Sequence, residues 1–237
     1  DTLYVAEATM VRRITLARPL DPASGTILRV AGNGTTPSSG TGIPALTAGV
    51  AAPQAMAVDA FGNLYLADYA MHAIRRVTWN ADEPALSQID TVVGNGANDR
   101  PVEGPALASP LGDPMGLAFA PDGSMLVAEV NSGSVLRVTR PGADPAQWQL
   151  ARIAGGQADI DVMEGTPATT ARLWTTSLAA RGGKLYFTDY DRDVIWSVDL
   201  SDPHDVLTWT LRRVAGGGES LADGVAAKEA SLSLVKD

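Results

Sequence analysis

The acidic side chains whose spacing is most suggestive of chemistry lie near residue 190. Asp189, Asp191 and Asp193 place carboxylates at positions i, i+2 and i+4, which is the spacing of oxygen ligands in a calcium-binding loop. The segment lacks the glycine that follows the third acid in such loops, and position twelve would be Leu200 instead of glutamate. The three aspartates are therefore an incomplete calcium motif, and calcium is the one cofactor that the sequence leaves open.

Four carboxylates recur at an almost constant distance along the chain. Glu7, Asp68, Glu129 and Asp189 each end a run such as Leu64–Asp68, at spacings of 61, 61 and 60 residues. In one interpretation they form a ring that holds a cation near the axis of the molecule. In the other, each accepts backbone N–H groups of the turn that follows its strand. Recurrence in every unit favours the structural role, because a catalytic residue need occur only once.

Few other residues suggest catalysis. His72 and His204 are too few and too scattered for a His-rich zinc or copper site. No Gly-x-Ser-x-Gly segment supports a serine nucleophile, and the chain contains no cysteine. We therefore predict no catalytic and no cofactor-binding residues, and the three aspartates near residue 190 are the leading candidates for a metal, ahead of the similar cluster Asp159, Asp161 and Glu164.

The elements that must position these residues form a repeat. A second marker, a small residue followed by glycine, occurs at Gly32, Gly94, Gly155 and Gly216, with spacings of 62, 61 and 61 residues. Two independent markers with one period of about 61 residues indicate four repeat units that make residues 1–237 one domain or a fragment of one.

Each unit is expected to form four short strands. The first is typified by Ala55–Val58, the second by Leu64–Asp68 and the third by Ile74–Val77, and the fourth ends at the glycine marker. The second strand is apolar at consecutive positions, as strands buried on both faces are. Such sheets need neighbours on both sides, so the sequence predicts an all-β fold, a β-propeller with four four-stranded blades in this chain.

Several segments of the repeat units are similar to the repeat motif of a known protein family. The second unit reads Gly62-Asn63-Leu64-Tyr65-Leu66-Ala67-Asp68, then Met71-His72-Ala73-Ile74-Arg75-Arg76-Val77, and a linking motif occurs at Gly165-Thr166-Pro167-Ala168-Thr169-Thr170-Ala171-Arg172-Leu173. These segments resemble the NHL-repeat β-propellers of the bacterial secreted or envelope type. The resemblance implies a six-bladed ring, of which this chain would hold four blades, and a closed four-bladed ring is the alternative. Since the chain opens in mid-repeat at Asp1, we expect a fragment or a processed product.

Composition restricts the partners. Among the 237 residues, 45% are hydrophobic and 19% charged, and the net charge is −9, so we expect a globular protein that does not bind nucleic acid. The recurring arginines are interpreted as salt-bridged strand positions, with a basic RNA-binding face as the alternative: Arg12, Arg13, Arg75, Arg76 and Arg137. No stretch approaches the roughly 18 consecutive apolar residues of a membrane span, so we expect no membrane-spanning segment in this sequence.

The sequence favours a non-enzymatic propeller that binds a protein or glycan, or acts as a scaffold, at the bacterial cell envelope or outside the cell: extracellular, periplasmic or on the cell surface. Its variable loops motivate this hypothesis. A metal-dependent enzyme of the lactonase or lyase kind is the first alternative, although the axial ends of the first strands carry the inert Ala57, Ala118 and Ala179. A structural segment of a surface filament is the second. The rest of the polypeptide or neighbouring subunits are expected to cover the open blade edges.

Overall fold

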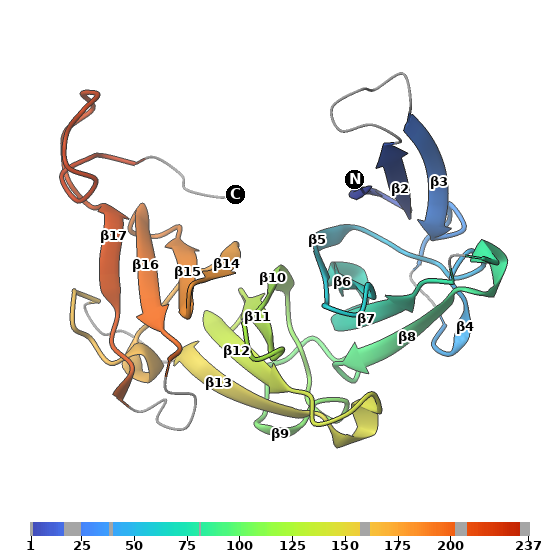
Figure 1. The fold of residues 1–237 in the computed structure, drawn as a ribbon. Coiled ribbons are helices and arrows are strands. Elements are labelled where there is room, and N and C mark those ends of the chain that lie inside the picture. Colours follow the sequence, from blue (N-terminus) through green and yellow to red (C-terminus); the bar gives the residue numbers. More distant parts are fainter. Residues whose placement is uncertain are drawn as a thin grey trace.

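The computed structural model describes residues 2–16, 25–37, 40–80, 82–156, 162–201 and 208–232. Within these ranges the chain forms four antiparallel sheets, arranged side by side as the blades of a β-propeller (Figure 1). The first blade consists of β1 (Thr2–Glu7), β2 (Met10–Leu16) and β3 (Gly25–Ala31). The prediction of an all-β propeller with four blades is confirmed.

The other three blades share one plan. From the axis outwards, the second blade has β5 (Pro53–Val58), β6 (Leu64–Asp68), β7 (Ala73–Thr78), β8 (Gln88–Val93) and the short β4 (Ile43–Pro44). The third has β10 (Pro114–Phe119), β11 (Met125–Glu129), β12 (Ser134–Thr139), β13 (Gln149–Gly155) and the short β9 (Gly104–Pro105). The fourth has β14 (Leu178–Arg181), β15 (Lys184–Asp189), β16 (Val194–Asp199) and β17 (Arg212–Gly216).

Three of the four blades differ from the expected four strands. The linking segments that hold β4 and β9 run back along the outermost strand of the blade that follows them, because Ile43 pairs with Ile89 and Gly104 pairs with Leu150. The first blade has three strands, since β1 is its counterpart of β6, β11 and β15 and no inner strand pairs with β1 among the described residues. Within the described ranges, the short 3-10 turns include η2 (Tyr69–Met71), η3 (Pro84–Leu86), η4 (Pro145–Gln147) and η5 (Ala168–Thr170).

The second strands are interior in three blades. All five residues of β6 and of β11 are buried, and β15 is buried from Leu185 onwards except for the half-buried Tyr186. The same prediction is wrong for β1, an edge strand with several exposed residues. The difference arises because, among the described residues, no inner strand pairs with β1 and the face of β1 that carries Leu3 is uncovered.

Apolar residues in register form the cores between blades. Leu64, Val77 and Ile89 lie opposite one another on β6, β7 and β8 and pack against the first blade. Met125, Val138 and Leu150 do the same between the second and third blades. Between the third and fourth blades, the paired Leu185 and Val198 pack in one core cluster with Leu211.

The equivalent row of the first blade faces no other blade among the described residues. Leu3, Ile14 and Ile27 pair across β1, β2 and β3, and we call them the open row. Leu3 is 58% exposed and Ile27 52%, whereas their counterparts Leu64 and Ile89 are 1% and 0% exposed. The open row therefore has the composition of a blade interface without a blade against it.

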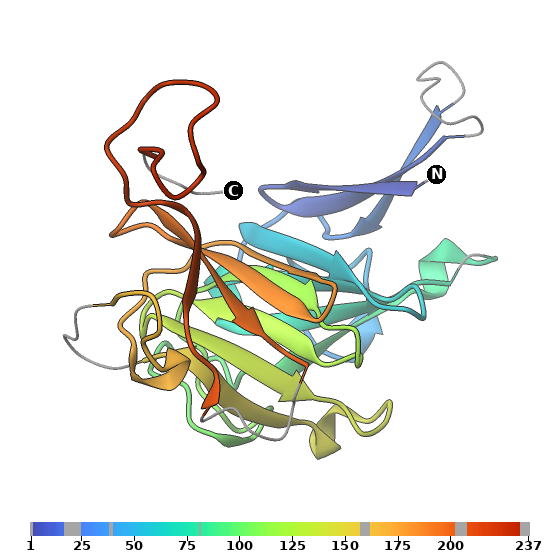
Figure 2. The same cartoon turned by 60° about the vertical axis from the view of Figure 1, so that its left-hand side comes forward.

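The four blades form an open arc. Figures 1 and 2 show the first and last blades on opposite sides of a gap, in two views. The last blade is also less covered than the inner ones, because Tyr186, Ile195 and Val214 are half-buried while their counterparts Tyr65, Ile74 and Val92 are buried. This arrangement differs from the closed four-bladed ring considered as an alternative. No helix in the described ranges has the length and apolar character needed to cross a membrane.

Candidate functional site

The recurring carboxylates are held within their own blades. Asp68 accepts a hydrogen bond from the backbone N–H of Met71 at 3.3 Å. Glu129 accepts from the backbone N–H groups of Asn131 at 2.8 Å and Ser132 at 2.9 Å. Both are fully buried. The interpretation that these acids organise the turn after the second strand is confirmed for these two residues.

In three blades, the side chain at one equivalent position of the repeat binds the recurring carboxylate. This position lies on β2, β7 and β16. In the first blade, Arg12 Nε lies 2.9 Å from Glu7 Oε1, and in the second, Arg75 Nη1 lies 3.2 Å from Asp68 Oδ2. The fourth blade uses Trp196, whose indole N–H donates to Asp189 Oδ2 at 3.2 Å. The third blade departs from this pattern, because Leu136 occupies the position and cannot donate.

The three aspartates near residue 190 do not converge on a common point. Asp189 is buried and accepts from Arg192, at 2.9 Å, and from Trp196, while Asp191 is exposed. Burial raises the pKa of Asp189, although the Arg192 guanidinium and the Trp196 hydrogen bond oppose the rise. Within the described ranges, no group of three or more His, Cys, Asp or Glu side chains is placed to hold a metal ion.

His72 connects two blades. Its Nδ1 lies 2.6 Å from the carbonyl oxygen of Gly112 and 3.8 Å from Asp113 Oδ1, both of which precede the innermost strand of the third blade. His72 has a left-handed backbone with φ 51°, which closes the turn before β7. His204 lies outside the described residues.

The recurring arginines are largely ion-paired. Besides Arg12 and Arg75, Arg76 pairs with Asp90 at 3.5 Å and Arg137 pairs with Asp122. Arg13 stacks on Trp79, with its guanidinium carbon 5.3 Å from the ring centre. The interpretation of these positions as salt-bridged strand residues is confirmed for the four that have carboxylate partners.

A hollow of about 610 Å³ opens between the second and third blades. The turn from β5 to β6 forms one side, and the turn from β10 to β11 and the loop from β12 to β13 form the other. We call it the interblade hollow, and its principal lining residues are Asp59, Phe61, Asn63, Asp122, Arg140 and Trp148.

Arg140 forms the floor of the interblade hollow. Its Nη1 donates to the Tyr65 hydroxyl at 2.7 Å and to Asp59 Oδ2 at 3.3 Å, and its Nε and Nη2 donate to the Gly123 carbonyl at 3.0 and 2.7 Å. Its guanidinium carbon also lies 5.4 Å from the ring centres of both Tyr65 and Trp148. One side chain of the third blade thus fixes the polar groups of the second.

The floor has defined charges at neutral pH. Burial would raise the pKa of Asp59, but hydrogen bonds from Asn63, Tyr65 and Phe61 together outweigh it and hold the pKa below its usual value. Burial is also the main cause that raises the pKa of Tyr65 to about 12. Asp59 is therefore an ionised acceptor and Tyr65 a neutral donor, both held by the cationic Arg140.

The rim of the interblade hollow is accessible. Phe61 is 87% exposed, the Asp122 side chain is 46% exposed, and Asn63 is half-buried. An exposed aromatic ring beside planar polar side chains can bind a ligand that has both an apolar face and hydrogen-bonding edges.

The repeat pattern of the sequence does not reveal this site. Arg140 has no repeated counterpart, since Trp79 and Leu200 follow the third strand in the second and fourth units. That departure from the repeat was the available signal. It carries no information on the contact with Tyr65, because the two residues are 75 positions apart.

Comparisons with known proteins place the chain among propellers. No family model and no curated protein matches the sequence. Among solved structures, a Bacteroides thetaiotaomicron protein of unknown function matches with a TM-score of 0.61 and 15% identity, over 100% of this chain and 50% of that one. An auxiliary nutrient binding protein from Bacteroides ovatus matches with 0.55 and 17%, over 90% and 45%.

An enzyme is also among the matches. The periplasmic gluconolactonase of Pseudomonas aeruginosa has a TM-score of 0.52 and 17% identity, over 90% of this chain and 53% of that one. The structural neighbours are thus bacterial β-propeller proteins that include both binding proteins and enzymes. This chain spans about half the length of the structures it matches.

Proposed function

We propose that this chain is part of a non-enzymatic bacterial β-propeller, of the NHL-repeat type, that binds a glycan in the interblade hollow. The observation that carries the proposal is the hollow itself, in which the exposed ring of Phe61 lies among planar polar side chains. A sugar ring has an apolar face and a hydroxylated edge, and this combination of groups is complementary to both.

The dimensions and rigidity of the hollow support a bound ligand. Its volume of about 610 Å³ lies within the roughly 300–1,000 Å³ typical of sites for small molecules. The bonds of Arg140 to Tyr65 and Asp59 fix the floor before any ligand arrives. Binding to a preformed floor loses little conformational entropy. A glycan fits this concave site better than the flat surface of a protein partner.

The hydrogen bonds of the floor favour binding over catalysis. Asp59 accepts from the backbone N–H groups of Phe61 and Asn63, and also from Tyr65 and Arg140. A carboxylate with so many donors and a lowered pKa is a poor general base, because a base needs a free oxygen and a matched pKa. The proposed function requires no metal.

The location and assembly of the protein follow from the same proposal. Glycans are abundant at the cell envelope, and the names of the structural neighbours include a periplasmic protein and a nutrient-binding protein. We place this protein in the periplasm, at the cell surface or outside the cell. The open row is covered by further blades of the same polypeptide or by neighbouring subunits, which complete a larger ring, of six blades in the NHL pattern.

Glycan binding is tested with the full-length protein on an oligosaccharide array, followed by titration calorimetry of the best ligand. The Phe61→Ala variant should bind at least about tenfold more weakly, because it removes the exposed ring from the rim. Leu86→Ala is the matched control, since Leu86 is also exposed, at 55%, but lies on the turn η3. Equal binding by both variants contradicts the proposal. A hydrolytic activity that chelators abolish would replace it with the metal-dependent enzyme.

A further inference from the structure

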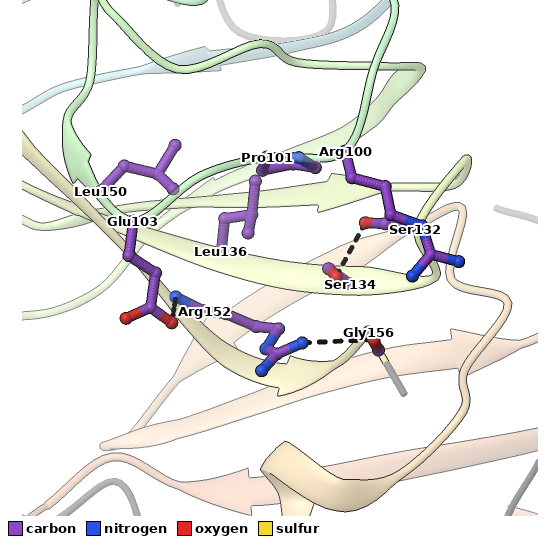
Figure 3. Close-up of a pocket in the computed structure, with 9 residues that line it drawn as sticks. All are labelled: Arg100, Pro101, Glu103, Ser132, Ser134, Leu136, Leu150, Arg152 and Gly156. Atoms are coloured by element: carbon purple, nitrogen blue, oxygen red, sulfur yellow. Dashed lines mark hydrogen bonds between the residues drawn. The ribbon is translucent and has the colours of Figure 1, made fainter. Parts of the chain in front are cut away.

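A second pocket, of about 270 Å³, lies at the other end of the strands that border the interblade hollow. The loop after β8 contributes Arg100 and Glu103, β12 contributes Ser134 and Leu136, and β13 contributes Arg152. We call it the two-arginine pocket, and Figure 3 shows it. The two sites share no lining residue, so they are separate.

The two-arginine pocket exists because the third blade departs from the repeat. In the second blade, the equivalent of Leu136 is Arg75, whose guanidinium donates to the carbonyl oxygens of Gly40 and Gly49, both at 2.7 Å. These glycines belong to the segment that links the first blade to the second. In the fourth blade the equivalent is the buried Trp196. The shorter Leu136 leaves open the space next to the corresponding link.

Two guanidinium groups border this space. Arg152 Nη1 donates to the carbonyl oxygen of Gly156 at 3.2 Å, and Arg100 is exposed. Across the part of the chain that the structure describes, neither guanidinium forms an ion pair with a carboxylate. In a protein with a net charge of −9, two such arginines at one pocket provide a local site for an anionic group.

The remaining lining is polar on one side and apolar on the other. In the view of Figure 3, Ser132 and Ser134 lie between the two arginine side chains, and their hydroxyl oxygens are 2.8 Å apart. The Ser132 hydroxyl also donates to the buried Glu129, the carboxylate to which Leu136 cannot donate a hydrogen bond. Glu103 is exposed, and its Oε1 accepts the backbone N–H of Arg152 at 3.3 Å. Leu136 and Leu150 form the apolar floor.

We propose that the two-arginine pocket binds a sugar acid, a hydroxylated monocarboxylate. Arg100 and Arg152 bind its carboxylate, Glu103 and the serine hydroxyls bind its hydroxyl groups, and the two leucines contact its carbon skeleton. The carboxylates of Glu103 and Glu129 would repel the second charge of a phosphate dianion. They favour a ligand with one negative charge and several hydroxyl donors.

Titration calorimetry of the full-length protein with glucuronate, glucose and inorganic phosphate tests the ligand class. Glucuronate should bind saturably, and more weakly as salt is added, because the contact with the arginines is electrostatic. Glucose and phosphate should bind at least about tenfold more weakly, since glucose lacks the carboxylate and phosphate lacks the hydroxylated carbon skeleton. Equal binding of phosphate, which marks a general anion site, or equal binding of glucose would overturn the proposal, as would no saturable binding of glucuronate.

The Leu136→Arg variant tests the location. It restores the residue that the second blade has at this position, where Arg75 is fully buried and paired, so the fold should be kept while the pocket is filled. We expect at least a tenfold loss of glucuronate affinity with an unchanged melting temperature. A folded Leu136→Arg protein that binds glucuronate normally overturns the proposal.

Further variants keep the location testable and separate it from the glycan site. If Leu136→Arg fails to fold, Arg100→Gln on the exposed loop should give a similar loss of glucuronate affinity, and unchanged affinity would then overturn the proposal. Arg29→Gln is the matched control, because Arg29 is exposed and occupies the position of Arg152 in the first blade. Phe61→Ala should leave glucuronate binding unchanged, since Phe61 lines the interblade hollow.

Discussion

At the scale of single residues, Arg140 joins the second and third blades. It binds a carboxylate and a hydroxyl of the neighbouring blade and a carbonyl of its own. Its side chain is 12% exposed and that of Asp59 2%, so both groups are largely desolvated and depend on their protein partners.

Arg140→Ala should destabilise the protein by about 3 kcal/mol, because it leaves Asp59 as a buried charge without its cation. Arg140→Lys should recover part of that loss, since an ammonium keeps the charge but cannot make the same set of bonds. Urea unfolding of both variants measures the difference. An Arg140→Ala protein as stable as the parent would show that the cluster contributes nothing to the blade interface.

The pH dependence of stability should reveal Asp59. Its pKa in the folded protein lies below the usual 3.8, so the unfolded chain takes up a proton first as the pH falls. The stabilisation by Asp59 is therefore fully present above the unfolded pKa and is lost as the pH falls through the folded pKa. The difference in unfolding free energy between the parent and Asp59→Asn should be constant near neutrality and shrink below about pH 4. A difference that grows on acidification would contradict the assignment.

At the scale of elements, equivalent positions of the repeat differ in burial because their neighbours differ. Tyr65 on β6 is 1% exposed and packs against the third blade, with its ring centre 5.1 Å from that of Phe119. Tyr186, its counterpart on β15, is half-buried in the last blade. Position within the repeat determines which residues are apolar, and position within the arc determines how much each one is buried.

Tyr65→Ala should therefore cost about 3–5 kcal/mol, as large-to-small core changes do, and Tyr186→Ala clearly less. The sequence alone predicts equal costs, since both tyrosines occupy the same repeat position. Thermal or urea unfolding of the two variants provides the comparison. Equal losses would indicate that the face of the last blade is covered in the folded protein.

Periodicity explains how much could be predicted from the sequence. Strands such as β6 and β11 are local, repeated and apolar on both faces, so spacing and pattern are sufficient to predict them. The short strands β4 and β9 were missed because each joins a blade that the chain completes later. The interblade hollow was missed for a similar reason, since contacts such as that of Arg140 with Tyr65 join residues 75 positions apart, and a repeat pattern contains no information on contacts made once.

At the scale of the whole molecule, the arc has two uncovered ends. The open row at one end and the half-buried Tyr186, Ile195 and Val214 at the other are counterparts of residues that pack together between the inner blades. The two ends therefore have matching chemistry. Exposed apolar faces of this kind favour association with other surfaces.

Residues 1–237 expressed alone should associate in solution. Sedimentation measurements should find assemblies or aggregates, because one end can pack against the other end of a second copy, a contact that does not close on itself. Ile27→Lys on the open row should shift the mass towards the monomer, while Ala60→Lys, on an exposed turn of the second blade, should not. A parent chain that is monomeric and melts cooperatively would show that the open row needs no cover.

The interblade hollow and the two-arginine pocket lie at opposite ends of β12 and β13. A ligand in the hollow touches the second and third blades, and a ligand in the pocket touches the third blade and the link that reaches it from the second. Because each blade contacts mainly its neighbours, both ligands thus contact the same interface, the one between the second and third blades. If a ligand at one site tightens this interface and thereby strengthens binding at the other, thermodynamic reciprocity requires the same factor in the opposite direction.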